Sequence, residues 1–238
     1  MEIIYTPSQV FQFESEIKNF ETLYNRLFPD PNEREDFSHI KNRLCTKKFS
    51  DDSKTFLILE DFSGLLCEYY LSCRSIFITY IAIDEKSRGK GLAKKIINKG
   101  VLIDLFKIIK KNTGNKPQAV FFESNNPCKT KYDSFDPYTR LNIFRKMGAR
   151  YINIPYIQPS LGENKSRVDN LLLFVFPIKN QKTQNFIKSN IIISFLFSFY
   201  KEFGVINPNS DPDFINMINS IDSKYTYLYE VPLFKKLF

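Results

Sequence analysis

The stretch 84–95 reads Asp-Glu-Lys-Ser-Arg-Gly-Lys-Gly-Leu-Ala-Lys-Lys and combines features that bind phosphate when they occur together. Gly89 and Gly91 allow positive φ angles and a close approach of the backbone to a bulky ligand. The apolar pattern after Gly91 predicts a helix, whose first N–H groups have no partner within it and lie at the positive end of its dipole. Three basic side chains surround the glycines: Lys86, Arg88 and Lys90. The turn is therefore predicted to bind an anion, most naturally a diphosphate.

Two common phosphate-binding motifs are excluded. A Walker A loop is excluded because no Gly-Lys-Ser/Thr follows a four-residue spacer. A Rossmann fingerprint would need a third glycine three residues after Gly91, where the chain has Lys94. The alternative without a ligand is a tight turn at a helix start with solvated lysines.

The elements around this turn follow from periodicity. Runs of β-branched and aromatic residues separated by short turns predict an antiparallel meander before it, with strands at 55–60, 65–71 and 76–83. Amphipathic patterns predict two earlier helices, at 7–27 and from Asp30-Pro31 to 45. After the turn we expect a helix at 92–110, a strand at 119–123, a helix from Asp136-Pro137 to Gly148, and strands at 151–155 and 170–176.

The pattern changes after Pro177. A nearly all-apolar helix is predicted at about 183–203, a second helix starts at Asp211-Pro212, and a strand is predicted at 225–229. We therefore expect a domain at 1–180 and a mainly helical extension at 181–238. Because its first helix is apolar, the extension must pack on something. The extension could cover the side of a functional site where a substrate binds, bury a sheet edge or form a homodimer.

Composition and charge indicate which kinds of binding partner are not expected. The chain has 238 residues, 43% of them hydrophobic and 25% charged, as in soluble globular proteins. Its net charge of +8 comes from lysines and arginines that are scattered, apart from those around the glycine turn and at 107–116. No recognition element accompanies them, so we do not expect a nucleic-acid partner. The start does not resemble a signal peptide, and the longest apolar run, near 191–197, is too short to span a bilayer. No membrane partner and a cytoplasmic location are expected.

Cysteine and histidine usage excludes further chemistry. No two of the four cysteines are three positions apart, and His39 is the only histidine. This argues against a metal site, a redox pair and most histidine-based catalytic schemes. We expect free thiols, an exposed His39 and no covalent enzyme intermediate.

Lys86-Ser87-Arg88-Gly89-Lys90-Gly91, between a strand and a helix, closely resembles the Arg/Gln-x-x-Gly-x-Gly/Ala motif of GNAT-type N-acetyltransferases. Lys86 departs from the usual Arg or Gln but keeps the charge. The segment 143–149, Ile-Phe-Arg-Lys-Met-Gly-Ala, is similar to the family's Leu-Tyr-Glu-Lys-Leu-Gly-Phe signature. The order of predicted elements agrees over about 1–178, and the segment 153–159 looks like bacterial members of unassigned substrate.

The resemblance implies a mixed α/β fold, with a mostly antiparallel central sheet flanked by helices, and acetyl-CoA as acyl donor without a metal. Backbone groups of Ile81 and Ile83 would pair with the pantetheine arm, and the strand at 119–123 would splay away to admit the thioester. Asn125 matches a position that often contacts the cofactor arm. The amides of six residues would hold the pyrophosphate: Arg88, Gly89, Lys90, Gly91, Leu92 and Ala93.

The chain departs from the family at the catalytic positions. The tyrosine that protonates the departing thiolate in many members is replaced by Phe144, which leaves Tyr156 and Tyr80 as candidates for the acid. An acceptor amine with a pKa of ~10.4 must lose a proton, at a cost of about 4.6 kcal/mol at pH 7. A carboxylate is the usual base, but the family's glutamate position falls at about Phe77. Glu68 and Glu123 are the two candidate replacements.

The expected function is therefore acetyl transfer from acetyl-CoA to a primary amine of a small molecule or peptide, by direct attack in a ternary complex. The alternative is a GNAT-like module that binds CoA or a partner without catalysis. Phe144 and the missing glutamate favour that alternative. The acceptor and the length of the acyl group stay open.

Overall fold

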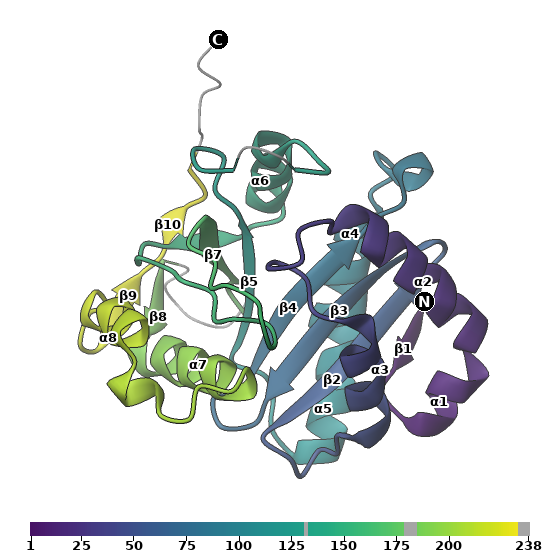
Figure 1. The fold of residues 1–238 in the computed structure, drawn as a ribbon, viewed down its shortest axis with the longest axis horizontal. Helices are drawn as coiled ribbons and strands as arrows, with labels where there is room; N and C mark the ends of the chain where they lie inside the picture. The colour runs from purple at the N-terminus through teal and green to yellow at the C-terminus, as the bar shows by residue number, and fades with distance from the viewer. Residues whose placement is uncertain (131–132, 179–184, 233–238) are drawn as a thin grey trace. The chain divides into compact units, whose positions relative to one another are not determined.

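The computed structural model describes residues 1–130, 133–178 and 185–232. The chain forms two compact units, unit 1 (Met1–Pro117) and unit 2 (Gln118–Phe238). Their helices and strands are drawn in Figure 1. In the part of the chain described, no helix is both long enough and apolar enough to cross a membrane.

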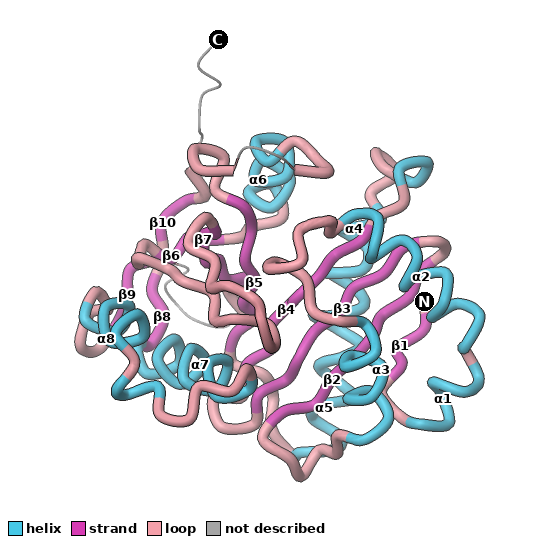
Figure 2. Tube along the Cα trace, in the orientation of Figure 1, coloured by secondary structure: helices cyan, strands magenta, loops and turns pink. Residues whose placement is uncertain are grey.

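Unit 1 contains an antiparallel sheet built from the predicted meander and one further strand (Figure 2). Its strands, in spatial order, are β1 (Glu2–Ile4), β2 (Ser53–Glu60), β3 (Ser63–Tyr70) and β4 (Ser75–Ala82). Every residue of β2 and β3 is buried, so both faces of the sheet are covered. This is why these strands read as continuous apolar runs rather than as alternating patterns.

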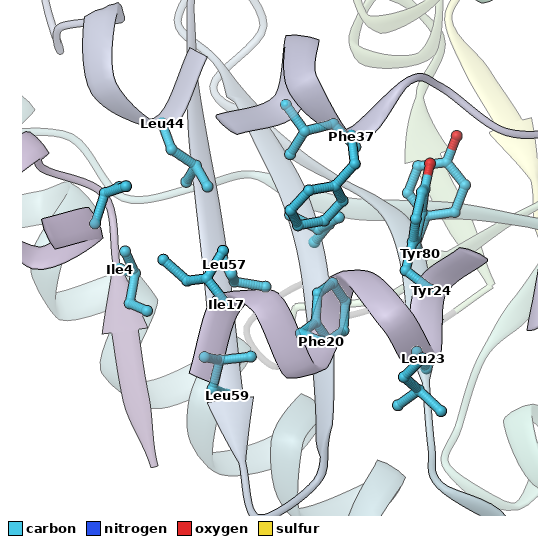
Figure 3. Close-up of a cluster of buried hydrophobic side chains, with 14 of the residues drawn as sticks. Ile4, Ile17, Phe20, Leu23, Tyr24, Phe37, Leu44, Leu57, Leu59 and Tyr80 are labelled. Carbon is cyan, nitrogen blue, oxygen red and sulfur yellow. The ribbon is translucent and has the colours of Figure 1, made fainter. Parts of the chain in front are cut away.

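Helices α1 (Pro7–Gln12), α2 (Glu14–Leu27) and α3 (Phe37–Thr46) pack on the sheet. Figure 3 shows side chains of α2 and α3 directed at the strands, where Tyr24 of α2 meets Tyr80 of β4 with ring centroids 4.8 Å apart. The helix after the glycine turn runs continuously as α4 (Leu92–Lys95), a π-helical stretch η2 (Ile96–Leu105) and α5 (Phe106–Thr113). It packs on β2 through Gly100, where a Cβ would lie 3.2 Å from Cγ2 of Ile58.

Two predicted helix boundaries in unit 1 are wrong. The helix predicted at 7–27 divides at Phe13, whose φ of −108° and ψ of 31° are not helical. The start predicted at Asp30-Pro31 is only a turn, because the Asp30 side chain accepts from the N–H of Asn32 at 2.8 Å. The second helix begins at Phe37 instead, after Asp36.

Unit 2 contains a second antiparallel arrangement of four strands, in the order β5 (Ala119–Asn125), β7 (Leu171–Phe176), β6 (Arg150–Ile152) and β10 (Tyr229–Glu230). A separate pair joins β8 (Phe186–Lys188) to β9 (Tyr225–Tyr227). The helices of the unit are α6 (Pro137–Lys146), α7 (Ser189–Glu202) and α8 (Pro212–Asn219). The predicted fold class, mixed α/β with antiparallel strands flanked by helices, is confirmed.

Phenylalanine rings from two helices cover β5. Phe121 stacks on Phe195 of α7 with ring centroids 4.3 Å apart, and Phe122 packs on Phe144 of α6 at 4.6 Å. Neighbouring residues of a strand point to opposite faces, so α7 and α6 cover the two sides of β5. Helix α7 begins at Ser189, later than the predicted start near 183, which falls outside the described residues. The division at residue 180 stays a prediction.

Candidate functional site

The glycine turn of unit 1 has the backbone that its sequence predicted. The chain leaves β4 at Ala82 and passes through the short 3-10 turn η1 (Glu85–Ser87). It then places Gly89 at φ +78° and Gly91 at φ +75°. Such angles are strained for residues with a Cβ. No atom lies within 4 Å of where a Cβ would stand at either glycine, so the backbone is open to an approaching group.

The helix starts directly after this turn. Gly91 is the residue before α4, and the N–H of Lys95 donates to its carbonyl at 3.0 Å. The preceding N–H groups, those of Leu92, Ala93 and Lys94, belong to the first turn and have no partner within the helix. The Lys95 ammonium is occupied by Glu60 at 2.6 Å. Lys90 remains exposed and can bring positive charge to an anion there.

A β-bulge bends β4 shortly before the turn. Tyr80 pairs with Leu66 and Ile78 with Cys67, so Thr79 is the extra residue, and its hydroxyl donates to the Leu66 carbonyl at 3.1 Å. Bulges redirect the strand that carries them and are common beside active sites. Ile81, the predicted pantetheine-pairing residue, follows two positions later. Nothing in the residue pattern of 76–83 indicates this bulge.

Ile81 and Ile83 are both half-buried. Ile81 lies within β4, in register with Leu65 of β3, and Ile83 is just beyond the strand end. The backbone groups of Ile81 and Ile83 therefore lie at the end of β4, just before the chain enters the glycine turn.

Glu68 of β3 lies in a buried ion-pair cluster and is only 2% exposed. The Thr55 hydroxyl donates to both of its oxygens, at 2.7 and 3.0 Å, and Arg43 of α3 lies 3.3 Å away. Arg43 also pairs with Glu35, which is 3% exposed. The guanidinium therefore bridges two buried carboxylates. Glu68 therefore takes part in a buried structural ion pair.

Glu123 of β5 is brought together with Tyr156, the candidate acid. The Tyr156 hydroxyl donates to Oε2 of Glu123 at 2.6 Å, and the side-chain amide of Gln158 donates to Oε1. Glu123 is half-buried, whereas Tyr156 is 4% and Gln158 2% exposed. The two donors stabilise the ionised carboxylate, and the Tyr–Glu hydrogen bond is a path along which a proton can move.

Gln158 is a residue that sequence reasoning missed. The alternation of a strand-like segment could have found it, because Ile154, Tyr156 and Gln158 are buried while Asn153 and Pro155 are exposed. The Gln158 backbone is fixed by two hydrogen bonds with Val168, at 2.8 and 3.2 Å.

Asn125, the predicted contact of the cofactor arm, is the last residue of β5. Its side-chain N–H donates to Asp133 at 2.8 Å, and Asp133 forms an ion pair with Arg140 of α6. Arg140 also donates to the Ser124 hydroxyl at 3.0 Å. This network fixes the orientation of the Asn125 side-chain amide, with its nitrogen hydrogen-bonded to Asp133. Neither Asp133 nor Arg140 was predicted.

Phe144 and the other candidate acid, Tyr80, lie in the core. Phe144 is 7% exposed and packs on Phe122. The hydroxyl of Tyr80, also 7% exposed, accepts from the N–H of Glu35 at 2.9 Å and donates to the Glu33 carbonyl at 3.3 Å. Tyr80 therefore has a structural position in unit 1.

The cysteines are free thiols. Burial raises the pKa of Cys67 and Cys73, which leaves both thiols protonated and weakly nucleophilic. His39 is exposed, as predicted. Within the described residues, no three His, Cys, Asp or Glu side chains come together in a way that could hold a metal ion.

Comparison with known proteins was made by sequence and by structure. No family model matches the chain, and no curated protein matches its sequence. A solved structure of a Bacteroides thetaiotaomicron protein assigned to the GNAT family of acetyltransferases superposes with a TM-score of 0.52 and 15% identity, over 74% of this chain and 87% of that one. The chain has the GNAT acetyltransferase fold.

Two further GNAT-fold neighbours superpose less well. An aminoglycoside 6'-acetyltransferase type Ii has a TM-score of 0.45 and 11% identity, over 76% of this chain and 99% of that one. The ribosomal-protein-S18-alanine N-acetyltransferase of Escherichia coli has a TM-score of 0.40 and 11% identity, over 71% of this chain and 94% of that one. The superposition with a TM-score of 0.52 confirms the GNAT fold predicted from the glycine motif, whereas the substrate is a matter for proposal.

Proposed function

We propose that this chain is an N-acetyltransferase that moves an acetyl group from acetyl-CoA to a primary amine of a small molecule or peptide. The observation that carries the proposal is the glycine turn between β4 and α4, in a chain with the GNAT fold. Its two glycines have positive φ and open backbone, and the helix that follows offers N–H groups to a diphosphate.

The proposed cofactor contacts are mostly made by the backbone. Amides from Arg88 to Ala93 would bind the pyrophosphate, and the backbone of Ile81 and Ile83 would bind the pantetheine arm. Asn125 stays a predicted contact of that arm. Since Asp133 engages its amide nitrogen, Asn125 would use its carbonyl oxygen as an acceptor.

Glu123 is the favoured base, with Glu68 as the second candidate. Glu123 is half-buried and its two hydrogen-bond donors, Tyr156 and Gln158, are neutral, whereas Glu68 is buried and paired with the Arg43 guanidinium. A carboxylate that accepts a proton from the acceptor amine makes the nitrogen nucleophilic. Glu123 is favoured because a proton that its carboxylate accepts can pass to the hydrogen-bonded hydroxyl of Tyr156.

The proposed reaction is a direct transfer. The acceptor ammonium gives a proton to Glu123, its nitrogen attacks the thioester carbonyl, and the C–S bond breaks. Tyr156 protonates the departing thiolate and recovers a proton from Glu123 across their hydrogen bond. The ammonium loses two protons overall, of which one ends on the CoA thiol and the other in solvent.

A non-catalytic CoA-binding module is the second candidate function. The position where many family members have an acidic tyrosine is Phe144, a core residue here. A chain that has lost its acid could still bind CoA through the glycine turn.

Turnover on a panel of primary amines, followed by release of free thiol, separates the two functions. The enzyme account predicts thiol release that depends on one class of amine and is nearly abolished in Glu123→Gln. Loss in Glu68→Gln alone, with Glu123→Gln active, would move the base to Glu68. Acetyl-CoA binding without turnover on any amine would support the module.

A further inference from the structure

The residue between the two hydrogen-bond donors to Glu123 is bound through its backbone by side chains of helices α7 and α8. Ile157 lies between Tyr156 and Gln158, and its carbonyl accepts a hydrogen bond of 2.8 Å from the hydroxyl of Tyr200 on α7. The Ile157 N–H lies 3.4 Å from the sulfur of Met217 on α8. Both backbone groups of Ile157 are therefore contacted by the region predicted as the C-terminal extension.

Tyr200 is itself fixed on several sides. It is fully buried, with its ring 5.6 Å from that of Phe214 between centroids and the Arg167 guanidinium 5.7 Å from its ring centroid. Arg167 in turn pairs with Asp211 and Asp213 at the start of α8. Burial raises the pKa of Tyr200, so its hydroxyl stays protonated and remains a donor over the whole physiological range.

We propose that Tyr200 is a positioning residue for Glu123, acting through the Ile157 carbonyl to hold Tyr156 and Gln158 on the carboxylate. The reactive role of that carboxylate rests on the proposed function; the positioning itself does not. The hydrogen bond fixes the backbone at Ile157, and the residues on either side of Ile157 carry the two donors to Glu123. A displacement of the backbone at Ile157 would move both donor side chains relative to the carboxylate. This gives the C-terminal helices a function beyond closing the core.

The direct readout is the protonation of Glu123. The groups seen to face it are the Tyr156 hydroxyl and the Gln158 amide, both of which favour the ionised form. We would record the ¹³C-carboxyl titration of glutamate-labelled protein by NMR and assign Glu123 by the loss of its signal in Glu123→Gln. Tyr200→Phe should raise the midpoint of that signal by about half a pH unit. Gln158→Leu, which removes one donor directly, should raise it at least as much.

Tyr24→Phe is the matched control. The Tyr24 hydroxyl also donates 2.8 Å to a backbone carbonyl, that of Glu35, and Tyr24 is also fully buried, but it lies in unit 1. The control should lose a similar amount of stability and leave the Glu123 midpoint unchanged. If Tyr200→Phe does not fold, Met217→Leu, which removes the sulfur contact to the N–H of the same residue, should raise the midpoint by a smaller amount.

An unchanged Glu123 midpoint in a folded Tyr200→Phe would overturn the proposal, as would an equal shift in Tyr24→Phe. The titration needs no acceptor, so it reports on Tyr200 even if no amine is acetylated and the proposed function fails. Where turnover is found, Tyr200→Phe should also lower kcat at pH 7 by about tenfold and move the acid limb of the pH–rate profile upward, with little change in KM for acetyl-CoA. A kcat and acid limb equal to those of the wild type would overturn the proposal as well.

Discussion

The hydroxyl of Tyr156 donates to Oε2 of Glu123 at 2.6 Å, although the two residues are 33 positions apart in the chain. Glu123 lies in β5, and Tyr156 lies in the loop after β6. Their contact places a proton donor on a carboxylate two residues before the end of β5. It distinguishes Glu123 from Glu68, which is bound instead to an arginine and a threonine.

Glu123→Gln should lower kcat for amine acetylation by about 10²–10⁴-fold, because an amide cannot accept the proton of the acceptor. Binding of acetyl-CoA, which we assign to backbone groups of the glycine turn, should stay within about twofold of the wild type. Steady-state kinetics and calorimetric titration check the two parts. A variant with full activity would remove Glu123 from the mechanism.

Arg43→Met should destabilise the chain by about 3–5 kcal/mol, because it leaves Glu35 and Glu68 buried without their shared counter-charge. Urea unfolding measures the change. Arg26→Met is the control, since the Arg26 side chain is 55% exposed and its ion pair with Asp84 should contribute under about 1 kcal/mol. Equal losses in both variants would show that the buried cluster is not the special feature.

Phe144→Tyr should not increase turnover, although it restores the residue type found in many GNAT members. The ring is 7% exposed and packs on Phe122, so a hydroxyl there would be buried in an apolar contact, at a cost of about 1–3 kcal/mol. Paired measurements of kcat and unfolding free energy decide this. A clear gain in kcat would place Phe144 at the thioester after all and displace Tyr156 as the acid.

Stability should depend on acid through Asp211. Hydrogen bonds from Arg167 hold the pKa of this carboxyl below its usual range. A carboxyl with a lowered folded-state pKa stabilises the protein above its unfolded pKa of about 3.9, and the stabilisation is lost as the pH falls through the folded-state value. Arg167→Met should therefore cost about 1–2 kcal/mol at pH 7, and the difference from the wild type should shrink below about pH 4.

Urea unfolding of both proteins between pH 2 and pH 7 tests this. Asp211→Asn should remove most of the extra acid sensitivity of the wild type. A difference that stays constant down to pH 2 would mean that Arg167 stabilises through its contact with the Tyr200 ring rather than through the carboxylate.

The glycine turn and the strands around it were predictable because their signals are local. Period, turn residues and the Gly-x-Gly spacing are all read within a few positions. The false helix start at Asp30-Pro31 shows the limit of such signals, since the same Asp side chain closes a turn at Asn32 instead. A helix cap and a turn use the same hydrogen bond from an Asp side chain to the backbone. Whether a helix follows depends on how the next residues pack.

The candidate site could be predicted as a set of residues but not as an arrangement. Glu123 and Tyr156 were each identified from the sequence, yet nothing local indicates that the loop after β6 brings Tyr156 to Glu123. The same holds for Tyr200, whose partner at Ile157 is 43 positions away. In the sequence Tyr200 is one more apolar position of a helix. A hydrogen bond between residues that are far apart in the chain cannot be predicted from the residue pattern of one sequence.

Binding of acetyl-CoA at the glycine turn tests the account most directly. A ligand at 100 times its Kd adds about 2.7 kcal/mol to stability, which a thermal shift detects as several degrees. We would compare acetyl-CoA, CoA and ATP on the wild type, Gly89→Glu and the control Gly114→Glu. Both glycines have similar φ, +78° and +72°, and open space around a Cβ, so the two variants carry the same backbone strain.

The account predicts that acetyl-CoA and CoA stabilise the wild type and Gly114→Glu but not Gly89→Glu, and that ATP has a smaller effect. No shift in the wild type, or an equal shift with ATP, would contradict it. The glycine turn would then be only a basic helix start, and the proposed acetyl transfer would have no donor site.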